Sequence, residues 1–149
     1  MSARFEVLRV DGEDYRHRTL VAGASSVPDA TVVDAVRDHP GAVIDDFDEL
    51  LAYLARVHPS RYGALLDDVT LLGLTGVHPV TDQSTALRLV VLVDRLYDRD
   101  VPVLLGGSGE SDLFSEEMRA GGYRKKYYRA LSRLGSLAAD CREMVERAA

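Results

Sequence analysis

The residues whose types and spacing most suggest chemistry are basic and lie in the last third of the chain. Between Arg119 and Arg133 the sequence reads RAGGYRKKYYRALSR. On a helix, Lys126, Arg129 and Arg133 fall at i, i+3 and i+7, so they share one flank of the apolar face. Guanidinium groups at such an edge suit bidentate recognition of an anion, including a phosphate. The alternative is a solvated basic flank, which most amphipathic helices have.

Other patterns point less clearly to chemistry. The stretch GGSG at 106–109 follows an apolar run and precedes a predicted helix near Ser111, where backbone N–H groups could meet an anion, but a turn needs no ligand. The four histidines lie in separate segments, so no metal site is predicted. The motifs GxxxxGK[ST], HExxH, CxxC and GxSxG do not occur. The sequence therefore predicts no complete catalytic site within these residues.

The elements that must position the basic residues alternate between apolar runs and amphipathic helices. Apolar stretches predict strands at 5–10, 42–44, 69–77 and 101–105. Helices are predicted after three aspartates that can act as N-caps, Asp29, Asp46 and Asp82. A long helix is predicted for the last segment, where apolar residues keep helical spacing at 127, 130, 131, 134, 138, 141 and 145.

Two of these helices have a defined apolar face. In the helix after Asp46, the predicted face consists of Phe47, Leu50, Leu51, Leu54 and His58. In the helix after Asp82, it consists of Ala86, Leu89, Val90, Val93, Leu96 and Tyr97, widened by Leu87, Val91 and Leu92. We expect Asp94 and Asp98 to cap this helix or to pair with Arg95 and Arg99.

The strand–helix–strand order in the middle of the chain is typical of a right-handed βαβ unit. We therefore predict an α/β fold: a parallel sheet of about three to four strands with flanking helices and a long C-terminal helix. A length of 149 residues fits a single domain, residues 1–149.

Composition limits the class of protein. A net charge of −6 argues against nucleic acid as a partner, and apolar stretches are too short to span a membrane. Cys141 is the only cysteine, which is typical of a reducing compartment, and the N-terminus lacks an ordinary secretory signal. These features predict a cytoplasmic location.

A series of motifs in a fixed order resembles a known family. They are VDGEDYR at 10–16, DFDEL at 46–50, TGV at 75–77, ALRLVVLVDRLYDR at 86–99 and RALSRL at 129–134. This series resembles the bacterial cell-division ATPase ZapE and its mitochondrial AFG-one-like relatives. Those proteins have Pro directly after the TGV-like segment, whereas here His78 comes before Pro79. They also have a proline-rich loop where this chain has GGSGESDL at 106–113.

The resemblance implies a partial AAA+-like P-loop NTPase fold and ATP hydrolysis with Mg²⁺. Family members carry Walker A and Walker B before the DYR segment, so we interpret this chain as the C-terminal portion of such an ATPase. By position in SRL, Arg133 is the candidate to contact a γ-phosphate, assisted by Arg129 and Lys126. By position in DYR, Arg16 is a second candidate, with Asp14 orienting it. The chain alone is expected to bind neither ATP nor Mg²⁺ tightly and to be inactive.

The expected partners follow from that interpretation. They are the missing ATPase half or a full-length homologue, cell-division proteins, and further copies of the chain through an apolar seam left bare. A second hypothesis is a non-enzymatic protein-interaction module that uses the same exposed surface. A third, a nucleic-acid contact by the basic helix, is disfavoured by the net charge.

Overall fold

A three-stranded parallel sheet forms the centre of the molecule. The computed structural model describes residues 39–107 and 113–148, with side chains up to Cys141. The strands are β1 (Ala42–Asp46), β2 (Leu71–Val77) and β3 (Val103–Gly107), in the order β1-β2-β3. Both strand pairs are parallel, which confirms the predicted α/β class. The arrangement is consistent with part of a P-loop NTPase-like fold. The predicted strand at 5–10, the helix after Asp29 and the residue Arg16 lie outside the described residues.

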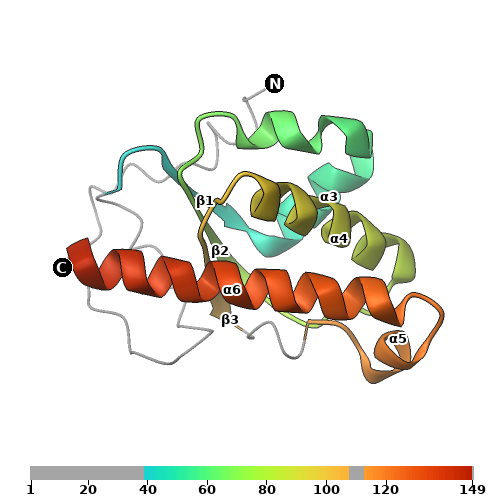
Figure 1. The fold of residues 1–149 in the computed structure, drawn as a ribbon. Helices are drawn as coiled ribbons and strands as arrows, with labels where there is room; N and C mark the ends of the chain where they lie inside the picture. The colour runs from blue at the N-terminus through green and yellow to red at the C-terminus, as the bar shows by residue number, and fades with distance from the viewer. Residues whose placement is uncertain (1–38, 108–112, 149) are drawn as a thin grey trace.

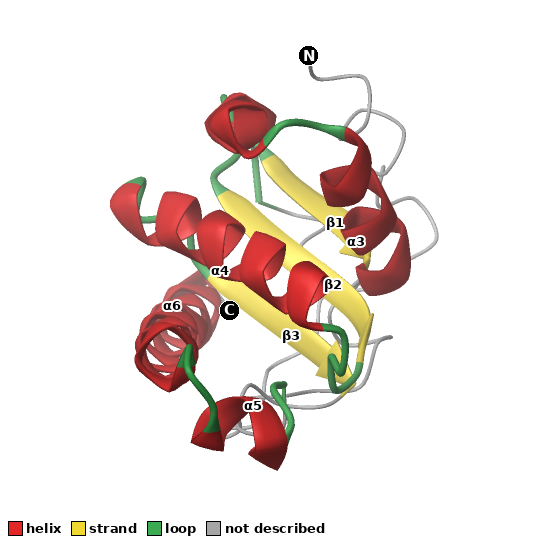
Figure 2. Ribbon diagram, turned by 90° about the vertical axis from the view of Figure 1, so that its right-hand side faces the viewer, coloured by secondary structure: helices red, strands yellow, loops and turns green. Residues whose placement is uncertain are grey.

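The helices pack against the sheet and against one another. Helices α3 (Phe47–Arg56) and α4 (Gln83–Asp98) lie on the face of the sheet that is turned toward the viewer in Figure 2. The 3₁₀ helix η1 (Pro59–Leu66) packs against α4. Helix α6 (Arg124–Ala148) runs along β3 and α4, and the short α5 (Glu116–Ala120) lies beside its first turns (Figure 1).

The predicted N-caps are confirmed at two helices. The Asp46 carboxylate accepts a hydrogen bond from the Glu49 backbone N–H at 3.1 Å, which begins α3 directly after β1. The Asp82 carboxylate does the same for the Thr85 N–H at 2.9 Å, which begins α4. Because each cap satisfies a backbone donor that the helix itself cannot, the strand-to-helix transitions are fixed by local sequence.

The core lies between the sheet and the α3–α4–α6 layer. It combines both faces that the sequence predicted, with contributions from η1 and α6; its largest fully buried side chains include Tyr62, Tyr127, Phe47, Phe114, Leu50, Leu54, Leu92 and Leu96. Two predicted face residues do not belong to it. Tyr97 is 40% exposed, and α3 ends at Arg56, so the exposed His58 instead accepts a hydrogen bond from the Ser60 N–H and caps η1. The predicted apolar face thus ran two residues past the end of α3 at Arg56, to the residue just before Pro59, where η1 begins.

The carboxyl ends of the strands meet at one edge of the sheet, where β2 and β3 approach closely. Gly107 ends β3 with φ +101°, and a Cβ atom there would lie 2.6 Å from the Val77 carbonyl oxygen. Only glycine fits at this position without displacing the backbone. The loops that lead from this edge into α4, α5 and α6 carry the polar groups discussed below.

Candidate functional site: an arginine cluster between α4 and α6

The packing of α6 on α4 brings together the basic residues that the sequence singled out. Ala130, Leu134 and Leu137 are buried on the side of α6 that faces the core, and Arg133 lies at its edge with 30% of its side chain exposed. We call the group formed by Asp94 and Tyr97 of α4 with Arg129 and Arg133 of α6 the arginine cluster. Because α6 is one continuous helix, the arginines are held at a fixed spacing along α4.

Arg133 is held on two sides. Its Nη1–H donates to Asp94 Oδ1 at 2.7 Å, and its guanidinium carbon lies 4.8 Å from the centre of the Tyr97 ring. The ion pair fixes the in-plane direction of the guanidinium and the ring covers one of its faces, an arrangement of the cation–π type. A guanidinium has five N–H donors, so one hydrogen bond to Asp94 leaves donors for a further anion.

The other basic residues that the sequence singled out are held by weaker contacts or lie outside the cluster. Arg129 Nη2 lies 3.7 Å from Asp94 Oδ2, an ion pair with half of the arginine side chain exposed. Lys126 is exposed one turn earlier on α6. Arg16 lies outside the described residues. The structure thus brings Arg129 and Arg133 onto one carboxylate and leaves Lys126 at the periphery.

The ion-pair partners of Asp94 in the structure differ from those that the sequence predicted. The sequence suggested capping or pairing with Arg95 and Arg99, but Asp94 binds Arg133 and Arg129 of α6. Arg95 pairs with Asp98 at 3.6 Å, and Arg99 with Asp67 at 2.9 Å. Only the docking of α6 on α4 reveals this pairing, because Arg133 is 39 residues away from Asp94 in sequence.

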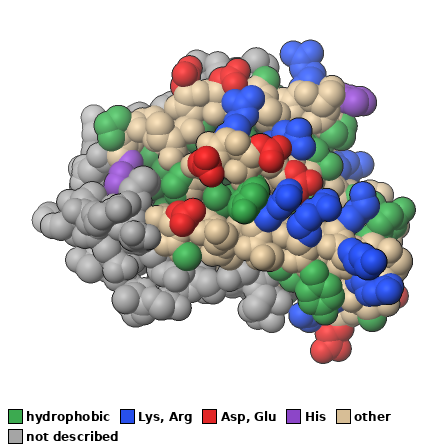
Figure 3. Space-filling view, viewed as in Figure 1, with side chains coloured by type: hydrophobic (Ala, Val, Ile, Leu, Met, Phe, Trp, Pro, Cys, Tyr) green, Lys and Arg blue, Asp and Glu red, His purple; other side chains and the backbone are tan. Residues whose placement is uncertain are grey.

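The space-filling view shows the surface around the cluster. Lys and Arg side chains gather over the N-terminal half of α6 and beside α5, on the right-hand side of Figure 3. The exposed large hydrophobic side chains of the described residues are Tyr97, Tyr123 and Tyr128, and all three belong to α4, α6 or the turn before α6. This face is therefore basic and aromatic in a chain of net charge −6.

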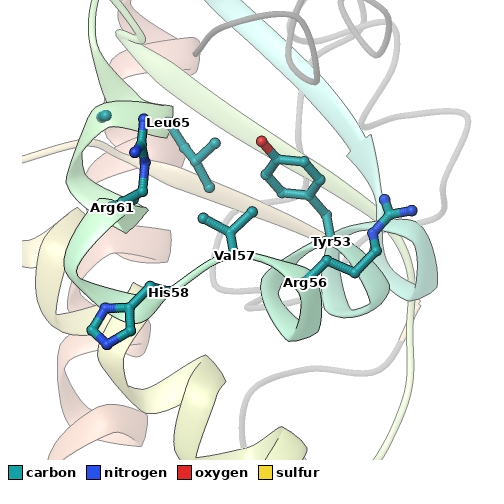
Figure 4. Close-up of a pocket in the computed structure, with 7 residues that line it drawn as sticks. Tyr53, Arg56, Val57, His58, Arg61 and Leu65 are labelled. Atoms are coloured by element: carbon teal, nitrogen blue, oxygen red, sulfur yellow. The ribbon is translucent and has the colours of Figure 1, made fainter.

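A pocket on the opposite side of α4 was not predicted. It lies between α3 and η1 and has a volume of about 280 Å³ (Figure 4). Its lining consists of Tyr53, Arg56, Val57, His58, Arg61, Ala64 and Leu65. Arg56 packs over the Tyr53 ring, 5.7 Å from its centre, while Arg61 stands on the other side of Val57. The two guanidinium groups do not converge on one point, so the pocket lacks a clear anion site.

Metal and membrane binding were also considered for the described residues. Within 39–107 and 113–148, no three His, Cys, Asp or Glu side chains come together in a way that could hold a metal ion. In the same part of the chain, every helix is too short or too polar to cross a bilayer.

Comparison with known proteins decides the family. Residues 30–147 match the family model described as AFG1-like ATPase, which covers most of the chain. The chain belongs to the AFG1-like ATPase family. No curated protein and no solved structure matches it significantly. The family in general uses a nucleotide and Mg²⁺. The donor set of the cluster fits phosphate oxygens.

Proposed function

We propose that this chain supplies phosphate-directed arginines to the nucleotide site of a ZapE-type ATPase. In this proposal the phosphate-binding loop and the metal-holding acids come from residues outside this sequence, which contains no GxxxxGK[ST]. The observation that carries the proposal is the fixed position of Arg133, which Asp94 and Tyr97 hold while 30% of its side chain remains exposed.

The physical basis is preorganisation. Phosphoryl transfer depends on positive groups that are already in place where negative charge develops. A flexible arginine loses side-chain entropy when a ligand fixes it. Because Asp94 and Tyr97 already hold Arg133 in the free protein, less entropy is lost when the ligand binds. ATP with Mg²⁺ would supply the transferable phosphoryl group and its charge neutralisation. Arg133 would hold a phosphate oxygen, and Arg129 would assist it.

The roles of the remaining candidates are secondary in the same proposal. Lys126 would attract the anion toward α6 from its exposed position. Arg16 would act as a second phosphate-directed or inter-subunit arginine. By itself, the 149-residue chain would not hydrolyse ATP, because positioning and charge stabilisation would both be incomplete.

The test is a substitution series in the ATP-hydrolysing protein that contains this sequence. Arg133→Ala should lower kcat by at least tenfold, because it removes a contact that strengthens in the transition state. Lys125→Ala is the matched control, since Lys125 is an exposed cation on the same helix outside the cluster. Asp94→Asn should raise KM or lower kcat by a smaller factor, because Arg133 stays present but is less well held.

The readout separates catalysis from structure. If Arg133→Ala and Asp94→Asn destabilise the protein equally and both leave ATP turnover unchanged, the ion pair only ties α4 to α6 and the proposal fails. If Arg133→Ala abolishes turnover with unchanged melting temperature, the proposal holds.

The motif series at 10–16, 46–50, 75–77, 86–99 and 129–134 supports the finer assignment to a cytoplasmic cell-division ATPase. The partners would then be division proteins and the Walker-bearing part of the ATPase. A fluorescent fusion of this chain should accumulate at the division site, and an even distribution throughout the cell cycle would contradict the assignment.

A second candidate is a non-enzymatic interaction module, favoured by the exposed tyrosines beside the basic residues. Tyr and Arg are the residue types that most often dominate binding energy at protein interfaces. In this case the chain should self-associate through α6. Sedimentation at increasing concentration should show a dimer that Tyr128→Ser weakens, and a monomer at all concentrations would exclude this form of the hypothesis.

A further inference from the structure

The pocket between α3 and η1 lies apart from the arginine cluster, and no residue of that cluster lines it (Figure 4). We call it the α3–η1 pocket. Its lining comes from the last turn of α3, from the two linking residues Val57 and His58, and from η1. All of these segments belong to one stretch of chain, so the pocket is formed by local packing.

Two hydrogen bonds fix the walls of this pocket. The buried Tyr62 hydroxyl donates to the Leu54 carbonyl at 2.7 Å, which ties η1 to the last turn of α3. At the start of η1, the Ser60 N–H donates to His58 Nδ1 at 3.1 Å. Because both contacts are made within the protein, the hollow is formed before a ligand binds, and binding does not have to order its walls.

The more deeply buried part of the lining is apolar. Leu65 is buried, and Val57, Ala64 and the Tyr53 ring are half-buried. Tyr53 and Val57 also pack against the hydrophobic core, which holds them in place. At about 280 Å³ the pocket lies below the usual range for drug-sized ligands, so we expect it to fit one large apolar side chain.

The exposed part of the lining is positively charged. Arg56 and Arg61 are both exposed, and neither forms an ion pair within the part of the chain that the structure describes. By contrast, Arg95 and Arg99 have carboxylate partners. No described Asp or Glu lines the pocket, although the whole chain has a net charge of −6. A positive rim without a carboxylate is complementary to an acidic partner.

The positions of the two arginines narrow the partner further. Arg56 lies over the Tyr53 ring, 5.7 Å from its centre, and Arg61 lies on the other side of Val57 (Figure 4). Because the two guanidinium groups point to different places, a single phosphate or carboxylate does not fit both. Two separate carboxylates fit if an apolar group stands between them. A peptide with an apolar residue between acidic residues has this pattern.

We propose that the α3–η1 pocket binds an acidic segment of a partner protein, in which one large apolar residue is flanked by Asp or Glu. The apolar side chain enters the hollow against Val57 and Leu65, and its burial supplies affinity. The flanking carboxylates pair with Arg56 and Arg61 and supply specificity and faster association. The site is separate from the arginine cluster, so the inference does not depend on the proposed ATPase function.

The experiment is an NMR titration of the ¹⁵N-labelled full chain with synthetic peptides. The probe is acetyl-Gly-Glu-Glu-Phe-Glu-Glu-Gly-amide. One control peptide has Gln in place of every Glu, and the other has Gly in place of Phe. We expect the probe to shift the amide signals of His58, Ala64 and Leu65 in a saturable way. Each control peptide should bind at least about fivefold more weakly, and binding of the probe should weaken with added salt.

Two variants connect binding with the rim of the pocket. Arg56→Gln and Arg61→Gln should each weaken binding about threefold to fivefold, because each removes one exposed charge pair. Arg124→Gln is the matched control, because it removes the same charge from the exposed start of α6 and should leave the binding constant unchanged. All three side chains are exposed, so these substitutions should leave the fold intact.

Five results would overturn the proposal. Three concern the probe: no saturable shifts at His58, Ala64 and Leu65, equal binding of either control peptide, or equal affinity in either arginine variant and the unmodified chain. A fourth is an equal loss of affinity in Arg124→Gln, which would assign binding to the basic start of α6 or to overall charge. The fifth is binding of glutarate as tightly as the probe, which would assign the pocket to a small dicarboxylate.

Discussion

Two buried tyrosines, one in η1 and one in α6, differ in whether their hydroxyl groups are hydrogen-bonded. Tyr62 in η1 is fully buried, and its hydroxyl donates to the Leu54 carbonyl at 2.7 Å, which ties η1 to α3. Tyr127 in α6 is as deeply buried and packs on Phe114, with ring centres 4.7 Å apart, but its hydroxyl lacks a partner among the described residues. The Tyr62 hydroxyl therefore stabilises the fold through a hydrogen bond, whereas the Tyr127 hydroxyl does not.

The difference teaches that burial alone does not identify a structural residue. On the η1 side, the buried Tyr62 hydroxyl is hydrogen-bonded within the protein. On the α5–α6 side, the buried Tyr127 hydroxyl has no hydrogen-bond partner among the described residues, and the exposed Tyr123 and Tyr128 are close to it in sequence. A buried hydroxyl without a partner costs stability, so removing this atom should affect the two tyrosines differently.

The largest effect on stability is expected for a substitution at Gly107, at the carboxyl edge of the sheet. Gly107→Ala should lower the free energy of unfolding by about 3 kcal/mol, because its φ of +101° is strained for alanine and the new Cβ would meet Val77 backbone atoms. Urea denaturation measures this loss. Gly122→Ala is the control on the open side, where an added Cβ meets nothing within 4 Å, so its effect should stay within about 0.5 kcal/mol. Equal losses for the two variants would show that the open side is as tightly packed as the sheet edge.

The next effect tests the two tyrosines directly. Tyr62→Phe should lower the free energy of unfolding by about 1–2 kcal/mol, because the buried Leu54 carbonyl loses its hydrogen bond. Tyr127→Phe should leave stability unchanged or raise it by up to about 1 kcal/mol, because it removes an unpaired buried hydroxyl. Urea denaturation gives both values. A loss of similar size for Tyr127→Phe would mean that its hydroxyl is already satisfied.

A smaller effect is expected for the contact between α4 and α6. Asp94→Ala should cost about 1 kcal/mol, because its 17%-exposed carboxylate binds Arg133 at 2.7 Å. Asp98→Ala should be nearly neutral, because Asp98 is 58% exposed and lies 3.6 Å from Arg95. A double-mutant cycle of Asp94→Ala with Arg133→Ala measures the coupling. A coupling near zero would show that the cluster contributes nothing to the docking of α6.

The smallest effect is a pH dependence at the end of β2. The hydrogen bond with Asp48 raises the pKa of His78 above its usual value of 6.5, and the Pro79 carbonyl raises it further. Both ring nitrogens face oxygen acceptors, at 2.5 Å for Asp48 and 2.9 Å for Pro79, so the charged ring makes both contacts. The contribution is therefore complete below about pH 6.5 and is lost as the pH rises through the raised folded pKa.

Because both side chains are exposed, at 47% and 72%, this contribution should be only a few tenths of a kcal/mol and should weaken with added salt. Urea denaturation at pH 6 and pH 8 should show the loss in the unmodified chain and a flatter profile in Asp48→Asn. An unchanged profile in that variant would assign the pH dependence to other groups.

Much of the fold could be predicted from local pattern. The strands predicted at 42–44 and 69–77 are found at 42–46 and 71–77, and the caps at Asp46 and Asp82 are confirmed. These features were recognisable because they depend on residues close together in sequence. Prediction was less accurate where the chain changed its local geometry. The helix face was extended to His58 because periodicity does not show where Pro59 begins a 3₁₀ turn. Tyr97 was counted in the core because helical spacing does not show how far a neighbouring helix extends.

The sequence by itself determined the α/β character, the helix starts, the apolar faces and the shared flank of Arg129 and Arg133, since all of these follow from backbone periods and nearest neighbours. Tertiary structure alone decided that Asp94 binds those arginines and that the Tyr127 hydroxyl is left without a partner in the described residues. The physical reason is that ion pairs and buried polar groups depend on distances between segments far apart in the chain, which only the packing of α6 on α4 and β3 sets.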